Sequence, residues 1–547
     1  MASYSAPAQQ QQPLLIRVPS DVPFSKSILD CVNFKSGPSD CPGDRLVDIK
    51  RPIDDAMAIV NKLTMQIGSV STRIPPLVFT RLARGGKTTL LKLLFDRLKN
   101  DVKARYAPII INFNGNFGRR AEESYLDALM RLIATQLVDV PAKDAGNIVC
   151  DETALLKHID ETSKGMRVVL LIDELNSLCS PVDLATSVFL KDHFLDAANR
   201  YLVYSTHVPM EVDSHSSSME PRQGSRRGYK TVHLPKSYEL KDLRKMSEEC
   251  SSLNECEAAL YGGIPSLIYS SMSPDAESPK DRFTREMRNM KFDKDLPLSL
   301  LKEFVRSILT GNPISDDRFD RFSDFSKDKK HVWPLCYIAC MANQFTTVPE
   351  VASPCVALVK LIDINLAAHT EQIRTGKAWE VIVKVAVILR CLDAQLNQRS
   401  NPFGVIPLSR PAFQTIVVQM DEQVETLDAA REFIKARLVK RTSPTLFVFT
   451  PRYPTFPDLD GFVSFVDPSS SSPTTTVAYQ CKQGNATAPV PVPAWINLAY
   501  LLRGKAPKTT RGAQDELNWE YPDAVWMMLN LLGYSLSPVY PREWEKE

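Results

Sequence analysis

Hydrophobic residues in the first half of the chain fall into short continuous runs, which alternate with segments of helical periodicity. The runs that have the length of buried strands lie at residues 75–80, 107–113, 167–173 and 200–206. Helical patterns lie between them, for example at 54–69 and after residue 89. Short apolar strands that alternate with helices are typical of a parallel sheet covered by helices on both faces. The pattern therefore predicts an α/β domain.

The pattern changes twice in the second half. After about residue 235 the strand-like runs stop, and helical segments continue to about 370. A strongly apolar helix then precedes three strand-like segments, PTLFVFT, DGFVSFV and TVAYQCK, and the last segment, WEYPDAVWMMLNLLGYSL, has helical apolar content. These changes predict four parts, namely a flexible leader at 1–45, an α/β domain with a helical lid at 46–275, a helical connector at 276–370, and a second α/β domain at 371–547.

Composition narrows the class of protein. Of 547 residues, 44% are hydrophobic and 24% are charged, and 66 Lys and Arg against 64 Asp and Glu leave a net charge of +2. This balance argues against a histone-like DNA wrap, although one local basic cleft is compatible with it. Eleven cysteines occur without a CxxC pair, which argues against a zinc ribbon and favours a reducing compartment. We expect no membrane span, no secretory signal, and a nuclear or cytoplasmic location.

A phosphate-binding loop is the first candidate site. The segment RLARGGKTT lies between a predicted strand and a predicted helix, and Gly86, Lys87 and Thr88 match the second half of the P-loop pattern. Arg81 occupies the position of the first glycine, which departs from the pattern. Lys87 would bind the phosphates and Thr88 would hold Mg²⁺. The other residues of the predicted cradle are Arg81, Arg84, Gly85, Gly86 and Thr89.

An acidic pair lies at the end of the third predicted strand, about 85 residues after the phosphate-binding loop. Asp173 is expected at the carboxyl end of that strand, where it could join the Mg²⁺ shell, and Glu174 could activate a water molecule. A polar residue at the end of the fourth strand could contact the γ-phosphate, and we select Thr206 from Ser205, Thr206 and His207. The alternative interpretation is that these three residues simply cap a strand.

The segments RLARGGKTTLL, IIINFNG, LLIDELN and YGGIPSL together resemble the P-loop NTPase module of the Crinkler–RHS class. That class comprises the Crinkler effectors of oomycetes and fungi and the retrotransposon-hot-spot proteins of trypanosomes, and it is similar to AAA+ and STAND ATPases. The resemblance covers residues 50–275 and implies ATP as ligand, with Mg²⁺. It also implies that an arginine at the first glycine position is tolerated. The usual Crinkler translocation module is not recognisable, so secretion into a host cell would need another signal.

A second group of polar residues lies in the last domain. Asp460 precedes the strand-like segment GFVSFV, with Asp458 as its rival, and Gln480 and Lys482 lie two residues apart on the next segment. A hairpin would bring Asp460 beside Gln480 and Lys482, because residues two apart on a strand share a face. A carboxylate and a carbonyl-type oxygen can seat Mg²⁺, and a lysine can serve the water and the phosphate. The alternatives are an ordinary Asp-Gly turn and a solvent-facing strand.

This arrangement resembles the PD-(D/E)xK restriction-endonuclease-like fold, with Gln480 at the D/E position. The resemblance covers residues 371–547 and implies that Glu380, in the preceding helix, joins the metal shell. The prediction is thus an α/β protein with an ATP-hydrolysing domain and a Mg²⁺-dependent DNA endonuclease. One alternative is a nuclease-like domain that only binds DNA or a protein, and another is a signalling ATPase that acts through homo-oligomers.

Overall fold

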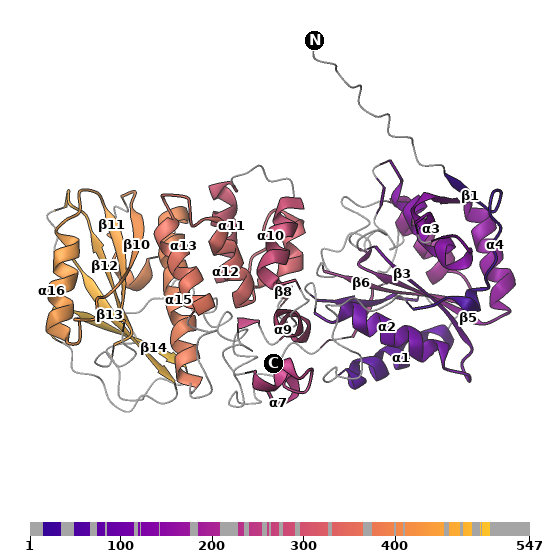
Figure 1. Ribbon diagram of the computed structural model, residues 1–547, viewed down its shortest axis with the longest axis horizontal. Coiled ribbons are helices and arrows are strands. Elements are labelled where there is room, and N and C mark those ends of the chain that lie inside the picture. The colour runs from indigo at the N-terminus through magenta and orange to yellow at the C-terminus, as the bar shows by residue number, and fades with distance from the viewer. Residues whose placement is uncertain are drawn as a thin grey trace, which may run out of the picture. The chain divides into compact units, whose positions relative to one another are not determined.

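Four apolar segments of the first half form most of one parallel sheet in the computed structural model (Figure 1). The strands are β2 (Leu77–Thr80), β3 (Tyr106–Asn112), β5 (Arg167–Asp173), β6 (Arg200–Thr206) and a short edge strand, β7 (Lys230–Thr231). Their order across the sheet is β3-β5-β6-β2-β7, and all the pairings are parallel. The predicted α/β class is therefore confirmed for this part of the chain.

The structure describes residues 15–33, 49–65, 74–81, 85–113, 119–120, 122–141, 143–175, 184–207, 228–232, 234, 240–253, 260–261, 264–272, 277–289, 296–325, 331–364, 375–398, 401–407, 411–452, 459–470, 474–483, 493 and 495–503. The chain forms two compact units, and the boundary between them lies after Pro235. The amino-terminal unit contains the parallel sheet. The sequence prediction grouped residues up to 275 with this sheet, whereas the structure groups residues 236–275 with the second unit. Periodicity identifies a helix but does not specify which core buries its apolar face.

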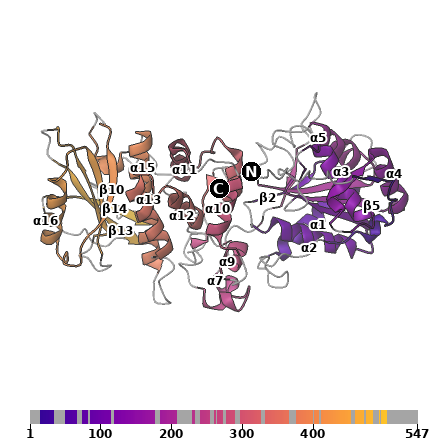
Figure 2. The same cartoon turned by 45° about the horizontal axis from the view of Figure 1, so that its top comes forward.

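Helices cover both faces of the parallel sheet (Figure 2). On one face, α1 and α2 pack against the sheet, and on the other face α3, α4 and α5 do so. The helices of this unit are α1 (Lys50–Met65), α2 (Lys87–Lys99), α3 (Tyr125–Leu137), α4 (Glu152–Ser163) and α5 (Leu184–Leu190), followed by the π-helical turn η6 (Lys191–Leu195). A short 3-10 helix, η4 (Ala145–Asn147), precedes the strand β4 (Ile148–Cys150), which leads into α4. Buried on both sides, the central strands can consist almost wholly of apolar residues.

Part of the predicted flexible leader is ordered, which corrects the prediction for residues 15–33. The strand β1 (Ile16–Val18) pairs in parallel with β4 (Ile148–Cys150), and η1 (Ile28–Asp30) follows it. Val18, Ile28 and Cys31 join the core that lies under α3 and α4. A Gln- and Pro-rich composition predicted a mobile segment, but a few apolar side chains are enough to anchor it against this face.

The carboxy-terminal unit begins with helices. They are α7 (Leu240–Leu243), η7 (Glu249–Ser252), α9 (Pro265–Met272), α10 (Pro279–Asn289), α11 (Leu298–Thr310), η8 (Asp317–Phe322), α12 (Leu335–Gln344), α13 (Ala352–Val359) and η9 (Lys360–Ile364), with a small hairpin of β8 (Asp324–Phe325) and β9 (His331–Val332). Aromatic side chains fill the space between α10, α11 and α12, and they include Phe283, Phe304 and Tyr337. The helical character predicted for 276–370 is therefore observed.

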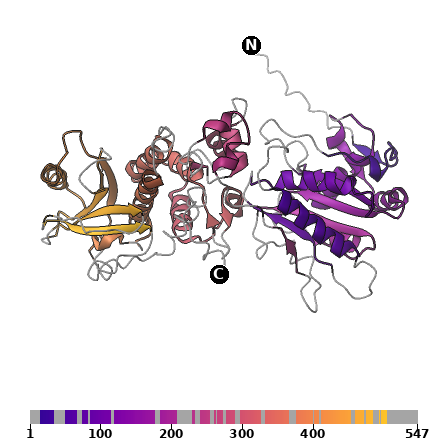
Figure 3. The ribbon, with the colours of Figure 1, turned by 90° about the horizontal axis from the view of Figure 1, so that it is seen from below.

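A five-stranded mixed sheet completes this unit, and its order is β10-β11-β12-β13-β14. The elements are α15 (Thr375–Asn397), η10 (Pro402–Gly404), β10 (Gln414–Gln419), α16 (Leu427–Leu438), β11 (Thr445–Thr450), β12 (Gly461–Val466), β13 (Thr476–Gln483) and β14 (Asn497–Arg503). The strands β11, β12 and β13 form an antiparallel meander, and β10 and β14 add in parallel at its two sides. Within this unit α16 covers one face of the sheet, and α13 and α15 cover the other (Figures 1 and 3).

The sequence did not predict β10, α16 or β14, and the helix predicted for WEYPDAVWMMLNLLGYSL lies outside the described residues. In the part of the chain that the structure describes, no helix is both long and apolar enough to cross a membrane.

Candidate functional site

The phosphate loop joins β2 to α2, as the sequence predicts. Gly86 is the N-cap of α2 and has φ of 90°, in the left-handed region that glycine adopts without steric cost. The N–H of Leu90 then donates to the Gly86 carbonyl at 2.9 Å, which starts the helix. This turn points the first N–H groups of α2 toward the end of β2, an arrangement that favours an anion.

Arg81, the residue that departs from the P-loop pattern, is part of the loop's own packing. Its side chain is 1% exposed, and its Nη1 donates to the Gly85 carbonyl at 3.4 Å. A Cβ at Gly85 would lie 2.7 Å from Cγ and Cδ of Arg81. The aliphatic part of Arg81 therefore occupies the space that a side chain at position 85 would need, which explains why a glycine follows there. Arg84 lies outside the described residues.

Asp173 and Thr88 meet at the carboxyl end of the sheet. The Thr88 hydroxyl donates to Oδ2 of Asp173 at 2.7 Å, and the Ser205 hydroxyl donates to Oδ1, also at 2.7 Å. Asp173 is completely buried. Burial and the nearby Glu174 carboxylate raise the pKa of Asp173 to about 6, against the opposing effects of the two hydroxyl donors and of the Lys87 ammonium. The two expected metal ligands are thus in contact although 85 residues separate them.

Lys87, His207 and Glu174 form a second chain of contacts beside the first. Lys87 Nζ donates to the Arg81 carbonyl at 2.7 Å and lies 3.0 Å from Nδ1 of His207. Nε2 of His207 lies 2.9 Å from Oε1 of Glu174. Because a carboxylate accepts, the Nε2–H of His207 donates to Glu174, and Nδ1 of His207 also lies 3.3 Å from the Arg81 carbonyl. His207 therefore connects the predicted phosphate ligand to the predicted base.

Glu174 has a strained backbone, with φ of 57°. Its N–H donates to the Ser205 hydroxyl at 2.8 Å, and that hydroxyl in turn donates to Asp173. A side chain other than glycine in this region costs of the order of 1 kcal/mol, and such residues often occur at functional sites. The turn separates the two carboxylates, because Asp173 binds hydroxyl groups while Glu174 reaches the imidazole.

The three polar residues at the end of β6 make different contacts, and the sequence did not indicate which residue makes which contact. Thr206, which we selected, is 1% exposed, and its carbonyl accepts the N–H of Arg81 at 3.4 Å. Its neighbours Ser205 and His207 make the side-chain contacts with the charged groups. The apolar run at 200–206 predicted the end of β6. Because three consecutive polar residues, Ser205, Thr206 and His207, lie there, the run does not indicate which side chain reaches the phosphate loop. Thr89, also predicted, follows Thr88 in the first turn of α2.

Replacing Asp173 by asparagine is expected to stabilise the ligand-free protein above pH 6. The folded-state pKa of Asp173 is about 6, and an unfolded aspartate has a pKa of about 3.9, so the charged form costs the fold roughly 3 kcal/mol at neutral pH. This cost is fully present above pH 6 and disappears as the pH falls from about 6 to about 4, because the folded state then binds the proton first. Urea unfolding of the two proteins at pH 8 and pH 5 tests this. A variant that is less stable than the wild type at pH 8 would contradict it.

The second predicted group lies on the β12–β13 hairpin. Gly461 pairs with Tyr479, and the Asp460 N–H donates to the Tyr479 carbonyl at 2.9 Å, so Asp460 is adjacent to Gln480. Gln480 is 3% exposed, and its Oε1 accepts no hydrogen bond in the part of the chain that the structure describes. A buried amide oxygen without a donor is costly and calls for a water molecule or a cation. Lys482 follows on β13, opposite Leu502 of β14. Asp458 lies outside the described residues.

Glu380 comes from another layer of this unit. Its helix, α15, packs beside β13 on the face of the sheet that is opposite to α16 (Figure 1). Ala478 and Phe462 belong to the core beneath α16, and Gln480, two residues after Ala478, lies on that same face. The structure therefore joins Asp460 to Gln480 but does not bring the helix of Glu380 to their face. The described residues contain no cluster of three or more His, Cys, Asp or Glu residues that could hold a metal ion.

Several solved structures are similar to parts of this chain. An Orc1 protein of Aeropyrum pernix, in complex with DNA, is 12% identical with a TM-score of 0.30, over 63% of this chain and 84% of that one. A Walker-type ATPase of Pyrococcus abyssi is 12% identical with a TM-score of 0.35, over 55% and 89%. Cdc6p from Pyrobaculum aerophilum is 14% identical with a TM-score of 0.30, over 66% and 96%.

No protein-family model matches the chain, and no curated protein matches it. The function is therefore argued from the geometry of the site. The Crinkler–RHS and restriction-endonuclease resemblances stay predictions.

Proposed function

We propose that the amino-terminal unit binds ATP with Mg²⁺ and hydrolyses it. The observation that carries this proposal is the contact between Thr88 and Asp173 at 2.7 Å, directly beside Lys87. A P-loop NTPase needs this trio, because a lysine binds the phosphates while a hydroxyl and a carboxylate hold the metal ion. Two segments that are far apart in the sequence, the loop with the start of α2 and the end of β5, converge on one point.

The residues present fit a magnesium ion. Mg²⁺ prefers oxygen donors and keeps several waters, so one hydroxyl and one carboxylate suffice when phosphate oxygens complete the shell. When bound, it would neutralise charge on the β- and γ-phosphates. Lys87 would leave the Arg81 carbonyl and His207 to bind phosphate oxygens. Glu174 would hold the attacking water and accept its proton, and His207 would orient the Glu174 carboxylate.

Thr88→Val is expected to weaken binding of ATP far more in the presence of Mg²⁺ than in EDTA. Valine keeps the shape of threonine but lacks the hydroxyl that bonds to Asp173. The loss should be on the order of tenfold in Mg²⁺, as for the removal of one charge-assisted hydrogen bond. Thr135→Val is the matched control, because it removes a hydroxyl that donates to the Arg131 carbonyl at 2.7 Å within α3, away from the loop, and should bind ATP as the wild type does. Titration with a fluorescent ATP analogue measures both. Equal affinities of the two variants in Mg²⁺ would argue against the metal role of Thr88.

A second candidate function belongs to the mixed sheet of the carboxy-terminal unit. We propose that this unit is a Mg²⁺-dependent DNA endonuclease of the PD-(D/E)xK type, as in the Crinkler–RHS arrangement of an NTPase with a nuclease. The buried Oε1 of Gln480 supports this, because it has no hydrogen-bond donor among the described residues and Gln480 is adjacent to Asp460. Asp460 and Gln480 would supply oxygen ligands, and Lys482 would stabilise charge on the phosphate. The competing proposal is an inactive nuclease-like domain that only binds DNA.

Supercoiled plasmid separates these two proposals for the mixed sheet. We expect the wild type to nick or linearise it in Mg²⁺, and Asp460→Asn and Lys482→Ala to lose about 100-fold or more of this activity. The control is Asp467→Asn, which makes the same change at the other end of β12, where Asp467 caps a turn by accepting the N–H of Ser469 at 2.9 Å. Parallel reactions with ATP test coupling to the first unit. Cleavage that survives in both site variants would reject the proposed site, whereas no cleavage by any protein would reject the nuclease and leave the DNA-binding alternative.

A further inference from the structure

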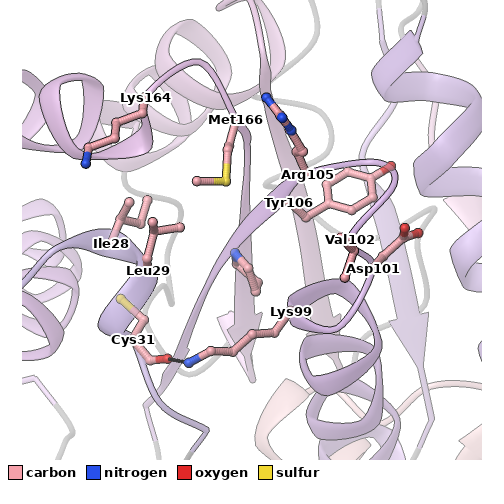
Figure 4. Close-up of a pocket in the computed structure, with 11 residues that line it drawn as sticks. Ile28, Leu29, Cys31, Lys99, Asp101, Val102, Arg105, Tyr106, Lys164 and Met166 are labelled. Atoms are coloured by element: carbon pink, nitrogen blue, oxygen red, sulfur yellow. Dashed lines mark hydrogen bonds between the residues drawn. The ribbon is translucent and has the colours of Figure 1, made fainter.

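A pocket lies at the opposite edge of the parallel sheet from the phosphate loop. It is formed where α2 ends and where β3 and β5 begin, and its volume is about 470 Å³. Figure 4 shows Lys164, Met166 and Arg105 along one side and Lys99 along the other, where Lys99 reaches Cys31. Lys87 begins α2 and Lys99 ends it, so roughly 18 Å of helix separates this pocket from the nucleotide site. It is therefore distinct from the site described above.

One part of the pocket is apolar. Ile28 and Cys31, from the ordered amino-terminal segment, are at most 1% exposed, and Tyr106 is 4% exposed. At the rim, Leu29 is 36% exposed and Val102 is 88% exposed. Both belong to the few large apolar side chains that are exposed in the described part of the chain. Apolar side chains left in water around a concavity are typical of ligand sites.

The other part of the pocket is basic. Lys99, Arg105 and Lys164 line it together with a single acid, Asp101. Asp101 is engaged in a turn, because its Oδ1 accepts the N–H groups of Lys103 and Ala104, each at 3.1 Å. Lys99 Nζ donates to the Cys31 carbonyl at 2.7 Å, which fixes one wall. Within the described residues, neither Arg105 nor Lys164 makes an ion pair, so the local charge favours an anion.

Two of these cations stand on strained backbone. Arg105 has φ of 52° and Lys164 has φ of 48°, and each precedes one of two neighbouring strands. Glycine would adopt this conformation without cost, whereas another side chain costs on the order of 1 kcal/mol at each position. The chain thus carries a cation at two adjacent places where glycine would be more stable. A role of the Arg105 and Lys164 side chains in binding, rather than in stability, explains why these positions are not glycine.

We propose that this pocket binds a small amphipathic anion, an organic acid with an apolar or aromatic body. Its body packs against Ile28, Leu29 and Met166, and its acid group lies near Arg105 and Lys164. The volume falls within the range of roughly 300 to 1,000 Å³ that small-molecule pockets have. Binding would tie the amino-terminal segment to the ends of α2 and α4. This inference does not depend on the proposed ATPase or nuclease activity.

The test uses 8-anilinonaphthalene-1-sulfonate, an amphipathic anion whose fluorescence rises in apolar sites, with the full-length protein at neutral pH. The wild type is expected to show one saturable site. The double variant Arg105→Gly/Lys164→Gly should bind about tenfold more weakly. Glycine relieves strain at both positions, so a loss of fold does not account for the result. Asn199→Gly is the matched control, since it relieves the same strain at φ of 58° outside the pocket and removes no charge.

Two further measurements test whether the dye binds in this pocket. Val102→Glu adds a negative charge at a position that is 88% exposed, and it should also weaken binding of the anion. The neutral analogue N-phenyl-1-naphthylamine should bind the wild type and the double glycine variant alike. The proposal is overturned if dye affinity is the same in the wild type, the double variant and Val102→Glu. Displacement of the dye by saturating ATP would also overturn it, because the dye would then occupy the nucleotide site.

Discussion

Lys87→Met is expected to weaken ATP binding by about 30- to 200-fold, since a charged hydrogen-bonding group of this kind contributes roughly 2–3 kcal/mol. Lys87 is the group on the loop whose ammonium lies where the phosphates would bind, and it is 3% exposed. Methionine keeps most of the aliphatic chain and removes the charge, so it leaves no cavity of the size that alanine would. Lys87→Arg should fail as well, because the guanidinium group is too large for a space bounded by Arg81 and His207.

Isothermal titration with ATP and with ADP measures this loss. Thermal unfolding of each variant provides the control, because a cooperative transition near that of the wild type shows that the unit is folded. Wild-type affinity for ATP in a folded Lys87→Met protein would refute the proposed nucleotide site. It would leave the anion pocket at the other end of α2 untouched, because that pocket contains other residues.

Glu174→Gln is expected to lower the rate of ATP hydrolysis by about 100-fold or more and to change ATP affinity less than about threefold. The Glu174 carboxylate accepts the Nε2–H of His207, and the amide oxygen of glutamine can accept it too. The amide cannot take a proton from water, so the chemical step is lost while the site keeps its shape. The variant should therefore hold ATP without turnover.

A matched control exists in the same unit. Glu152 lies 3.4 Å from Nε2 of His193 at the start of α4, so Glu152→Gln makes the same change in another Glu–His pair away from the loop. Its phosphate release should equal that of the wild type. Equal rates for Glu174→Gln and the wild type would remove Glu174 from the mechanism and make its imidazole contact purely structural.

The sequence by itself determined the elements on which the first site stands. The strands β5 and β6 were predicted at their observed bounds, because a short continuous apolar run bounded by charged or polar residues has the length and pattern of a strand buried on both faces. The Gly-Lys-Thr turn and the Asp-Glu pair could be assigned to the carboxyl ends of strands for the same reason. Parallel strands place these ends at one edge of the sheet, so the meeting of Thr88 and Asp173 follows from local patterns.

Only the tertiary structure decided which neighbouring side chain serves the site. At the end of β6 three polar residues follow one another, and the direction of each side chain selects Ser205 and His207 for the charged groups. Arg81 could not be interpreted from the loop pattern, because its contact is with the glycine four residues later. Local sequence propensity specifies helices and strands, but the contacts of long side chains depend on which distant segments lie next to them in the folded protein.

The same division applies to the remaining regions. Two consecutive strand-like segments predicted the β12–β13 hairpin, but only the resemblance to the PD-(D/E)xK fold placed Glu380 with Asp460 and Gln480, whereas the sheet separates their layers. Composition predicted a flexible leader, but β1 and η1 are held by apolar contacts with a core that is assembled from later segments. Strand and helix periods are local properties and can be read from neighbours in sequence. The choice of face, layer and core partner depends on contacts between distant segments, so it is settled only when the chain has folded.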